Sequence, residues 1–174
     1  MSETQLDVRG IGKSDAYRIL KEQLDAICEG VTDPIAVMAT MACVLHHGFG
    51  HLWTGFYRRL APTQLLVGPY QGMLGCMEIE MGRGVCGTAA LTRQTVIVPD
   101  VRLFAGHISC DARSMSEIVV PVFDYRGEVV AVLDIDSAET GTFDDVDQRA
   151  LESWVARFAQ DGIGHQEVNE KAST

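Results

Sequence analysis

Hydrophobic residues recur at helical spacing in two stretches near the start of the chain and in one near its end. The first stretch covers residues 13–29. The second covers residues 35–47, follows the helix-starting pair Asp33-Pro34, and is predicted to end at Gly48. The third begins at Phe143, where the apolar residues again follow the period of a helix. The pattern therefore predicts two helices at the start of the chain and one at its end.

Between these helices the pattern changes to short runs rich in β-branched and aromatic residues, which predict strands. The polar turns between the runs predict two antiparallel hairpins, of which the later one is the stronger. Residues 70–80 fit either a third strand or a mobile loop, and residues 82–92 begin with glycines and fit a short helix. A long connection rich in functional residue types precedes the last hairpin. The predicted strands are 52–58, 64–68, 95–98, 117–123 and 128–136.

The order of these elements predicts the fold class. Helices and strands do not alternate as in a parallel sheet, and no repeat is present. We therefore expect an α+β fold, with a central antiparallel sheet and the N- and C-terminal helices packed together on one face. Residues 13–162 should form a single domain, preceded by a flexible arm (1–12) and followed by a polar tail (163–174).

Composition narrows the functional class. The chain has 174 residues and a formal net charge of −10, which argues against a nucleic-acid partner. It shows neither a signal peptide nor an apolar run long enough for the membrane, so we expect a cytoplasmic protein. Five cysteines, an odd number, argue against a framework of structural disulfides.

The cysteines fall into two groups. Cys28 and Cys43 lie on apolar helix faces and are interpreted as small buried hydrophobic residues. Cys76, Cys86 and Cys110 lie in the polar, glycine-rich middle of the chain. Thiol redox chemistry needs a nucleophilic thiolate and a second thiol on mobile backbone, and this group supplies both.

Cys110 lies in a polar loop, near His107 and Arg113, which could tune a thiolate but receive no assigned role. A zinc site formed by Cys76, Cys86 and Cys110 is an alternative. No C-x-x-C pair is present, however, and a fourth ligand would have to be His107 or a carboxylate. We therefore expect no metal site.

Acidic residues form the second half of the candidate site. Alternation along a strand places Asp134 and Asp136 on one face, with Glu117 at the start of the neighbouring strand as a third acid. Like charges so placed repel unless a cation or a proton lies between them, so they suit a ligand's ammonium group. A solvated strand end is the alternative. Trp53 and Tyr57 on the first strand fit either ordinary core packing or an aromatic surface for a methyl-sulfur group.

Taken together, these segments resemble the free methionine-(R)-sulfoxide reductases, GAF-domain enzymes that act on the free amino acid. Three cysteines at these spacings, together with the Asp-Ile-Asp strand, are more discriminating than the GAF pattern alone. The resemblance covers about residues 15–160, and its matching segments are 53–57, 68–72, 82–90, 106–111, 116–119 and 132–137.

The resemblance implies roles for the three cysteines. Cys110 would be the nucleophile, Cys76 the principal resolving thiol, and Cys86 an accessory thiol in disulfide exchange. Thioredoxin would act as the external reductant, with free methionine sulfoxide as the substrate and no bound cofactor. The terminal helices could supply the face of a homodimer.

It also implies roles for the pocket residues. Glu117, Asp134 and Asp136 would bind the ammonium group and supply the proton for the sulfoxide oxygen, in an order that the sequence leaves open. Trp53, with Tyr57 on the same strand, would contact the methyl group. The alternative function is a GAF module that senses a small molecule or redox state without turnover.

Overall fold

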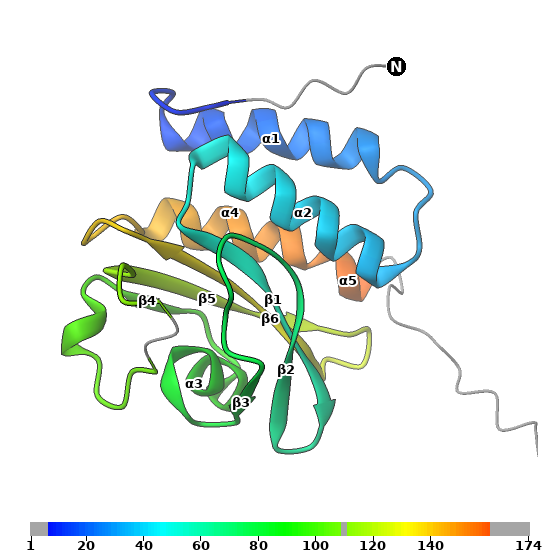
Figure 1. Ribbon diagram of the computed structural model, residues 1–174. Helices are drawn as coiled ribbons and strands as arrows, with labels where there is room; N and C mark the ends of the chain where they lie inside the picture. The colour runs from blue at the N-terminus through cyan, green and yellow to red at the C-terminus, as the bar shows by residue number, and fades with distance from the viewer. Residues whose placement is uncertain (1–6, 109–110, 161–174) are drawn as a thin grey trace, which may run out of the picture.

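The computed structural model describes residues 7–108 and 111–160 and has the α+β architecture expected from the order of the elements. Six strands form one antiparallel sheet in the order β3-β2-β1-β6-β5-β4. Helices α1, α2 and α4 cover one face of the sheet and α3 lies against the other (Figure 1). The elements are α1 Lys13–Ile27, α2 Pro34–Phe49, β1 Trp53–Ala61, β2 Gln64–Gln71, β3 Glu78–Glu80, α3 Gly84–Thr92, β4 Val96–Val98, the 3-10 helix η1 Val101–Leu103, β5 Ser116–Phe123, β6 Val129–Ser137, α4 Asp145–Val155 and α5 Arg157–Gln160.

Side-chain alternation along β6 divides the protein into two layers. Leu133 and Ile135 are fully buried in the core under α1, α2 and α4. Val132 packs in the smaller core under α3, and Asp134 and Asp136 face a pocket on that same side. The predicted placement of the two aspartates on one face is therefore confirmed.

Helix α2 begins as predicted but ends later. The Asp33 side chain accepts a hydrogen bond of 2.7 Å from the Ala36 N–H, which caps the helix. The predicted end at Gly48 is wrong, because the helix continues to Phe49 and ends at Gly50, whose φ is 73°. Gly48 instead allows close packing of the helices, since a Cβ there would lie 2.6 Å from Leu20 Cδ1.

The segment 70–80, for which a third strand or a mobile loop was expected, contains strand at both ends and a connection between them. Strand β2 extends to Gln71, residues 72–77 form a connection, and β3 pairs with β2 at the sheet edge. The long connection before β5 begins with the short helix η1. Within the described part of the chain, no helix is long and apolar enough to cross a membrane.

Two positions differ from their expected environments. Cys28 is 3% exposed, as expected for a small buried residue. Cys43 on α2, which was also expected to be buried, is only partly buried. Val8 belongs to the segment expected to be a flexible arm, yet it is buried and its N–H donates to the Gly48 carbonyl at 3.0 Å. The few apolar residues of this segment show no clear helical or strand period, so the pattern gave no signal for this contact.

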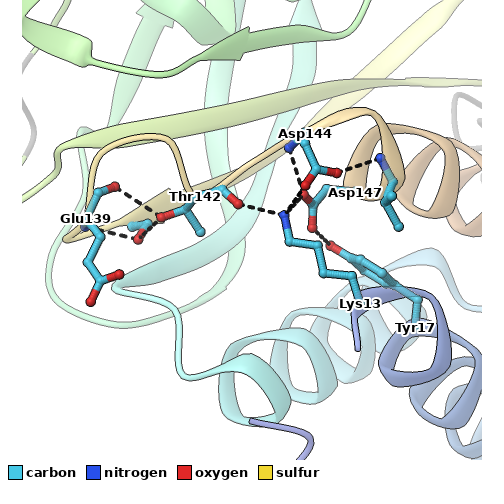
Figure 2. A network of polar contacts seen from close by, with 8 residues as sticks. Lys13, Tyr17, Glu139, Thr142, Asp144 and Asp147 are labelled. Carbon is cyan, nitrogen blue, oxygen red and sulfur yellow. Dashed lines mark hydrogen bonds and ion pairs between the residues drawn. The ribbon is translucent and has the colours of Figure 1, made fainter. Parts of the chain in front are cut away.

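A buried ionic network joins the first helix to α4 (Figure 2). Asp147 is 3% exposed and accepts hydrogen bonds from Lys13 Nζ and the Tyr17 hydroxyl, the latter at 2.9 Å. Lys13 also donates to Asp144, the N-cap residue of α4, at 2.8 Å and to the Thr142 carbonyl at 2.7 Å. These contacts fasten the N-terminal end of α1 to the start of α4.

Candidate functional site

A pocket opens between the sheet, α3 and the connection that precedes β5. Its empty volume is about 540 Å³, part of which is open to solvent. Of the eight predicted site residues, Cys110 lies outside the described residues. Cys76 directly follows Gly75, which lines the pocket. The other six line the pocket themselves: Trp53, Tyr57, Cys86, Glu117, Asp134 and Asp136.

Strand register brings the three acids together. Glu117 on β5 lies opposite Asp136 on β6, and Asp134 is two residues away on the same face. Glu117 is 5% and Asp134 6% exposed, so the alternative of a solvated strand end is wrong for Asp134. Trp53 on β1 lies opposite Asp136 on the other side of β6. The sheet thus places an aromatic ring and three carboxyl groups around one space.

Burial determines the protonation of these acids. It raises the pKa of Glu117 well above its ordinary value, and the nearby Asp136 carboxylate raises it further. Burial likewise raises the pKa of Asp134 well above normal, helped by Asp136 and Glu117. Burial raises the pKa of Asp136 to only about 6, because a hydrogen bond from Ser114 and the charge of His107 favour its ionised form. Asp136 therefore ionises most easily, whereas Glu117 and Asp134 tend to keep their protons.

The glycine-rich segment before Cys86 explains how this cysteine reaches the pocket. Gly84, the first residue of α3, has a φ of 61°, and a Cβ there would lie 3.2 Å from Ile108. At Gly87 a Cβ would lie 2.3 Å from the Glu80 carbonyl oxygen, so only glycine allows α3 this close to β3. The first turn of α3 consequently points Cys86 at the acids.

Cys86 is a buried free thiol, and its Sγ lies 4.0 Å from Glu117 Oε1. Burial raises its pKa well above the ordinary value, and the neighbouring Asp134 carboxyl raises it further, so the thiol form is favoured. Cys76, in the connection between β2 and β3, takes part in a disulfide bond, whereas Cys28 and Cys43 are free.

An aromatic stack forms one wall of the pocket. The Trp53 ring stacks on Tyr57 and Tyr70, with centroid distances of 5.7 and 5.3 Å, and its Nε1–H donates to the Met73 carbonyl at 3.1 Å. Gly75 lies against this wall: a Cβ there would be 3.0 Å from the Tyr57 hydroxyl oxygen and 3.3 Å from Trp53 Cζ2. The segment that carries Cys76 thus rests on the aromatic wall.

Two polar side chains near the acids had no predicted role. The Ser114 hydroxyl donates to Asp136 Oδ1, and His107 Nε2 lies 3.6 Å from Glu117 Oε2. Both come from the connection before β5, whose irregular backbone gives no periodicity from which a direction could be derived. Arg113 instead forms an exposed ion pair with Asp111 at 2.6 Å. The sequence signal for Ser114 was its place close before the predicted strand 117–123, which begins with Glu117.

Comparisons with known proteins agree with this geometry. The family model described as "GAF domain" matches residues 19–160. The chain is 39% identical to the free methionine-R-sulfoxide reductase of Escherichia coli over 149 residues, which is 85% of this chain and 89% of that one. The chain belongs to the free methionine-R-sulfoxide reductase family of GAF domains.

Other members of the free methionine-R-sulfoxide reductase family are similarly close. The Saccharomyces cerevisiae enzyme is 36% identical, covering 82% of this chain and 83% of its own. A solved free methionine-R-sulfoxide reductase from Neisseria meningitidis, in complex with its substrate, has a TM-score of 0.84 and 37% identity, covering 89% of this chain and 93% of that one. The predicted family and GAF-like α+β fold are confirmed, and the protein is an oxidoreductase of this family.

Proposed function

We propose that the protein reduces free L-methionine-(R)-sulfoxide to L-methionine with thiol reducing equivalents. The observation that carries the proposal is the group of three acids, Glu117, Asp134 and Asp136, lying beside Trp53 in one pocket. A free amino acid presents an ammonium group for the acids and a methyl-sulfur group for the ring. The names of the Escherichia coli and yeast relatives, and the substrate complex of the Neisseria meningitidis protein, support this substrate.

The acids divide the work according to their protonation. Asp136 ionises most easily, so its carboxylate pairs with the substrate ammonium. Glu117 keeps its proton because it is buried beside other acids, and it donates this proton to the sulfoxide oxygen as the S–O bond breaks. Asp134 supports Glu117 through a side-chain contact between the two carboxyl groups. The methyl group rests on the Trp53 ring.

The thiol steps use two cysteines in turn. The Cys110 thiolate attacks the sulfoxide sulfur, the oxygen is transferred to give a Cys110 sulfenic acid, and methionine leaves. The Cys76 thiol then attacks the sulfenic sulfur and expels water, forming a disulfide. The disulfide bond at Cys76 supports a redox role for this cysteine.

An external dithiol returns the enzyme to its reduced state. Reduced thioredoxin would attack the disulfide and become oxidised itself, which restores both enzyme thiols. No bound cofactor would be needed. Cys86 would act only as an accessory thiol, since burial keeps it protonated and enclosed.

The test is consumption of free methionine-(R)-sulfoxide coupled to thioredoxin and its NADPH-dependent reductase. We expect turnover with the wild type, none with Cys110→Ser, and normal turnover with the control Cys43→Ser on α2. N-acetylation of the substrate should remove most activity, because it deletes the ammonium group that Asp136 binds. Ligand binding without turnover by the wild type would favour the sensor alternative.

A second variant separates the resolving step from the first. Cys76→Ser should complete one stoichiometric turnover and then stop, because its sulfenic acid has no partner thiol. Rapid mixing followed by quantification of methionine measures this burst. Steady cycling by Cys76→Ser would transfer the resolving role to Cys86.

A further inference from the structure

A cysteine and two acids gather around one point of the pocket. Cys86 Sγ, a Glu117 carboxylate oxygen and an Asp134 carboxylate oxygen all lie within 4.8 Å of one another, and all three residues are buried. We infer that this trio binds a thiophilic divalent cation, Zn²⁺ or Cd²⁺, and that the bound cation blocks the pocket. Metal binding itself goes beyond the proposed reaction, in which no metal takes part; only the blocking of substrate rests on the proposed function.

The donor set decides the type of cation. One thiolate with two carboxylates suits a borderline-soft ion that accepts sulfur and oxygen together. Mg²⁺ and Ca²⁺ prefer all-oxygen ligand sets and should bind poorly here. Three protein ligands with a fourth position facing open space is also a common arrangement for zinc in accessible pockets.

An independent observation points to a missing partner at the same place. Asp134 is 6% exposed and its carboxyl contacts Cys86 and Glu117, yet its Oδ1 is buried with no hydrogen-bond partner among the residues that the structure describes. Buried polar atoms nearly always have a partner, because leaving one unsatisfied is costly. Asp134 lines the pocket, so a cation between Asp134 and Cys86 would satisfy this atom and reduce the repulsion among the acids.

The donor atoms, all within 4.8 Å of one another, are close to the spacing that such a site needs. With a Zn–S bond of about 2.3 Å and a Zn–O bond of about 2.1 Å, tetrahedral ligands lie about 3.6 Å apart. Cys86 Sγ and Glu117 Oε1 are 4.0 Å apart, so they need to approach by only a few tenths of an ångström. Glu117 lies on β5, an inner strand of the sheet, and Cys86 on α3, which packs against the sheet, so both are held by regular structure.

This trio differs from the zinc set considered from the sequence, which needed Cys76 and Cys110. Cys86 is a free thiol in the same structure in which Cys76 is disulfide-bonded. The site should therefore bind metal in the oxidised protein, whereas a site built on the Cys76 thiol would exist only after reduction. The redox state of Cys76 thus separates the two possibilities.

The experiment is calorimetric titration of the oxidised, chelator-treated full chain with ZnCl₂ or CdCl₂ alone, after mass spectrometry confirms the disulfide at Cys76. We expect one ion per chain, no comparable heat with MgCl₂, and at least about tenfold weaker binding by Cys86→Ser. Asp134→Asn provides a second variant and should weaken binding similarly. Cys43→Ser, on the opposite layer, is the matched control and should bind like the wild type. Circular dichroism establishes that each variant is folded.

Several results would overturn the inference. Zinc binding of wild-type strength in both Cys86→Ser and Asp134→Asn would exclude this trio, as would binding that appears only after the disulfide is reduced. Free methionine-(R)-sulfoxide, added before the metal, should lower the apparent zinc affinity; no competition would reject the blocking of the pocket. Because the titration needs no turnover, a protein that binds zinc through Cys86 yet reduces no sulfoxide would reject the proposed function alone.

Discussion

Glu117 and Asp136 lie directly opposite each other on β5 and β6, with their side chains in the same pocket. Two carboxyl groups in opposed positions repel when both are ionised, and burial of Glu117 adds the cost of removing a charge from water. A sheet selected for stability alone would place an apolar or oppositely charged pair here. The arrangement therefore costs stability at this part of the sheet, a cost that the proposed binding role of these acids would explain.

Glu117→Gln should stabilise the metal-free protein at alkaline pH. The pKa of Glu117 is higher in the folded protein than in the unfolded chain, where it is about 4.3. The unfolded chain thus binds fewer protons, so the wild type loses stability as pH rises from about 4 toward the raised folded pKa. Glutamine has no such loss, and its advantage should grow between pH 5 and pH 8. Each kcal/mol should raise Tm by about 2–4 °C.

Thermal unfolding in a chelator, at both pH values, checks this prediction. The exposed Glu29→Gln, beyond the end of α1, is the matched control and should leave the pH dependence of Tm unchanged. A Glu117→Gln variant that loses Tm equally at pH 5 and pH 8 would show that the raised pKa of Glu117 does not govern how stability changes with pH.

Ser114→Ala should shift the activity profile toward higher pH. The Ser114 hydroxyl donates to Asp136 Oδ1 and so favours the ionised form, which holds the pKa at about 6. Without this hydrogen bond the pKa of Asp136 rises, and the carboxylate that is proposed to bind ammonium is present only at higher pH. The acidic limb of kcat/KM should move up by about half to one pH unit, with little change at pH 9.

The profile of kcat/KM against pH, measured with and without the substitution, provides the test. Ser153→Ala on α4, whose hydroxyl donates to the Ala150 carbonyl, is the control and should keep the wild-type profile. An equal loss of kcat/KM at every pH would indicate that Ser114 only supports the local structure.

The acids of the site could be predicted because they lie on regular strands. The two-residue period of a strand fixes the face of Asp134 relative to Asp136, and a short hairpin turn then sets the partner strand beside them. The place of Trp53 could be predicted for the same reason, because this residue begins the neighbouring strand β1. Sequence periodicity predicts the direction of a side chain wherever the backbone forms a regular strand or helix.

Other contacts could not be predicted because they depend on tertiary packing or irregular backbone. Ser114 and His107 lie in the connection before β5, so their directions follow from the path of the chain. Gly48 resembled a helix end in sequence, yet it provides room for Leu20 of α1. A glycine that ends a helix and one that admits a neighbouring helix look alike until the packing is known.

Gly75→Ala should impair substrate binding more than folding. A Cβ at residue 75 would lie 3.0 Å from the Tyr57 hydroxyl oxygen and 3.3 Å from Trp53, so either the loop or the aromatic wall must move. We expect KM for free methionine-(R)-sulfoxide to rise several-fold while Tm stays within about 3 °C, equivalent to about 1 kcal/mol. In the control Gly12→Ala, the Cβ meets nothing within 4 Å. An unchanged KM in Gly75→Ala would show that the loop does not pack on this wall when substrate binds.

Lys13→Met should destabilise the protein far more than a surface ion pair would suggest. Lys13 is the cation that faces Asp147, which is 3% exposed and also holds the Tyr17 hydroxyl (Figure 2). Removing one partner of a buried pair leaves an uncompensated charge. Because the Lys13 side chain is itself 34% exposed and therefore partly screened, we expect a loss of about 1–3 kcal/mol in the free energy of unfolding.

Lys21→Met is the matched control for this prediction, because Lys21 lies on the same helix and pairs with Asp25 across an exposed turn. It should cost about 0.5 kcal/mol or less. Urea unfolding of both variants, followed by circular dichroism, measures the difference. Asp147→Asn in the Lys13→Met background should recover part of the loss, since it removes the stranded charge. Equal losses for Lys13→Met and Lys21→Met would mean that water reaches Asp147 and screens it in place of the lysine.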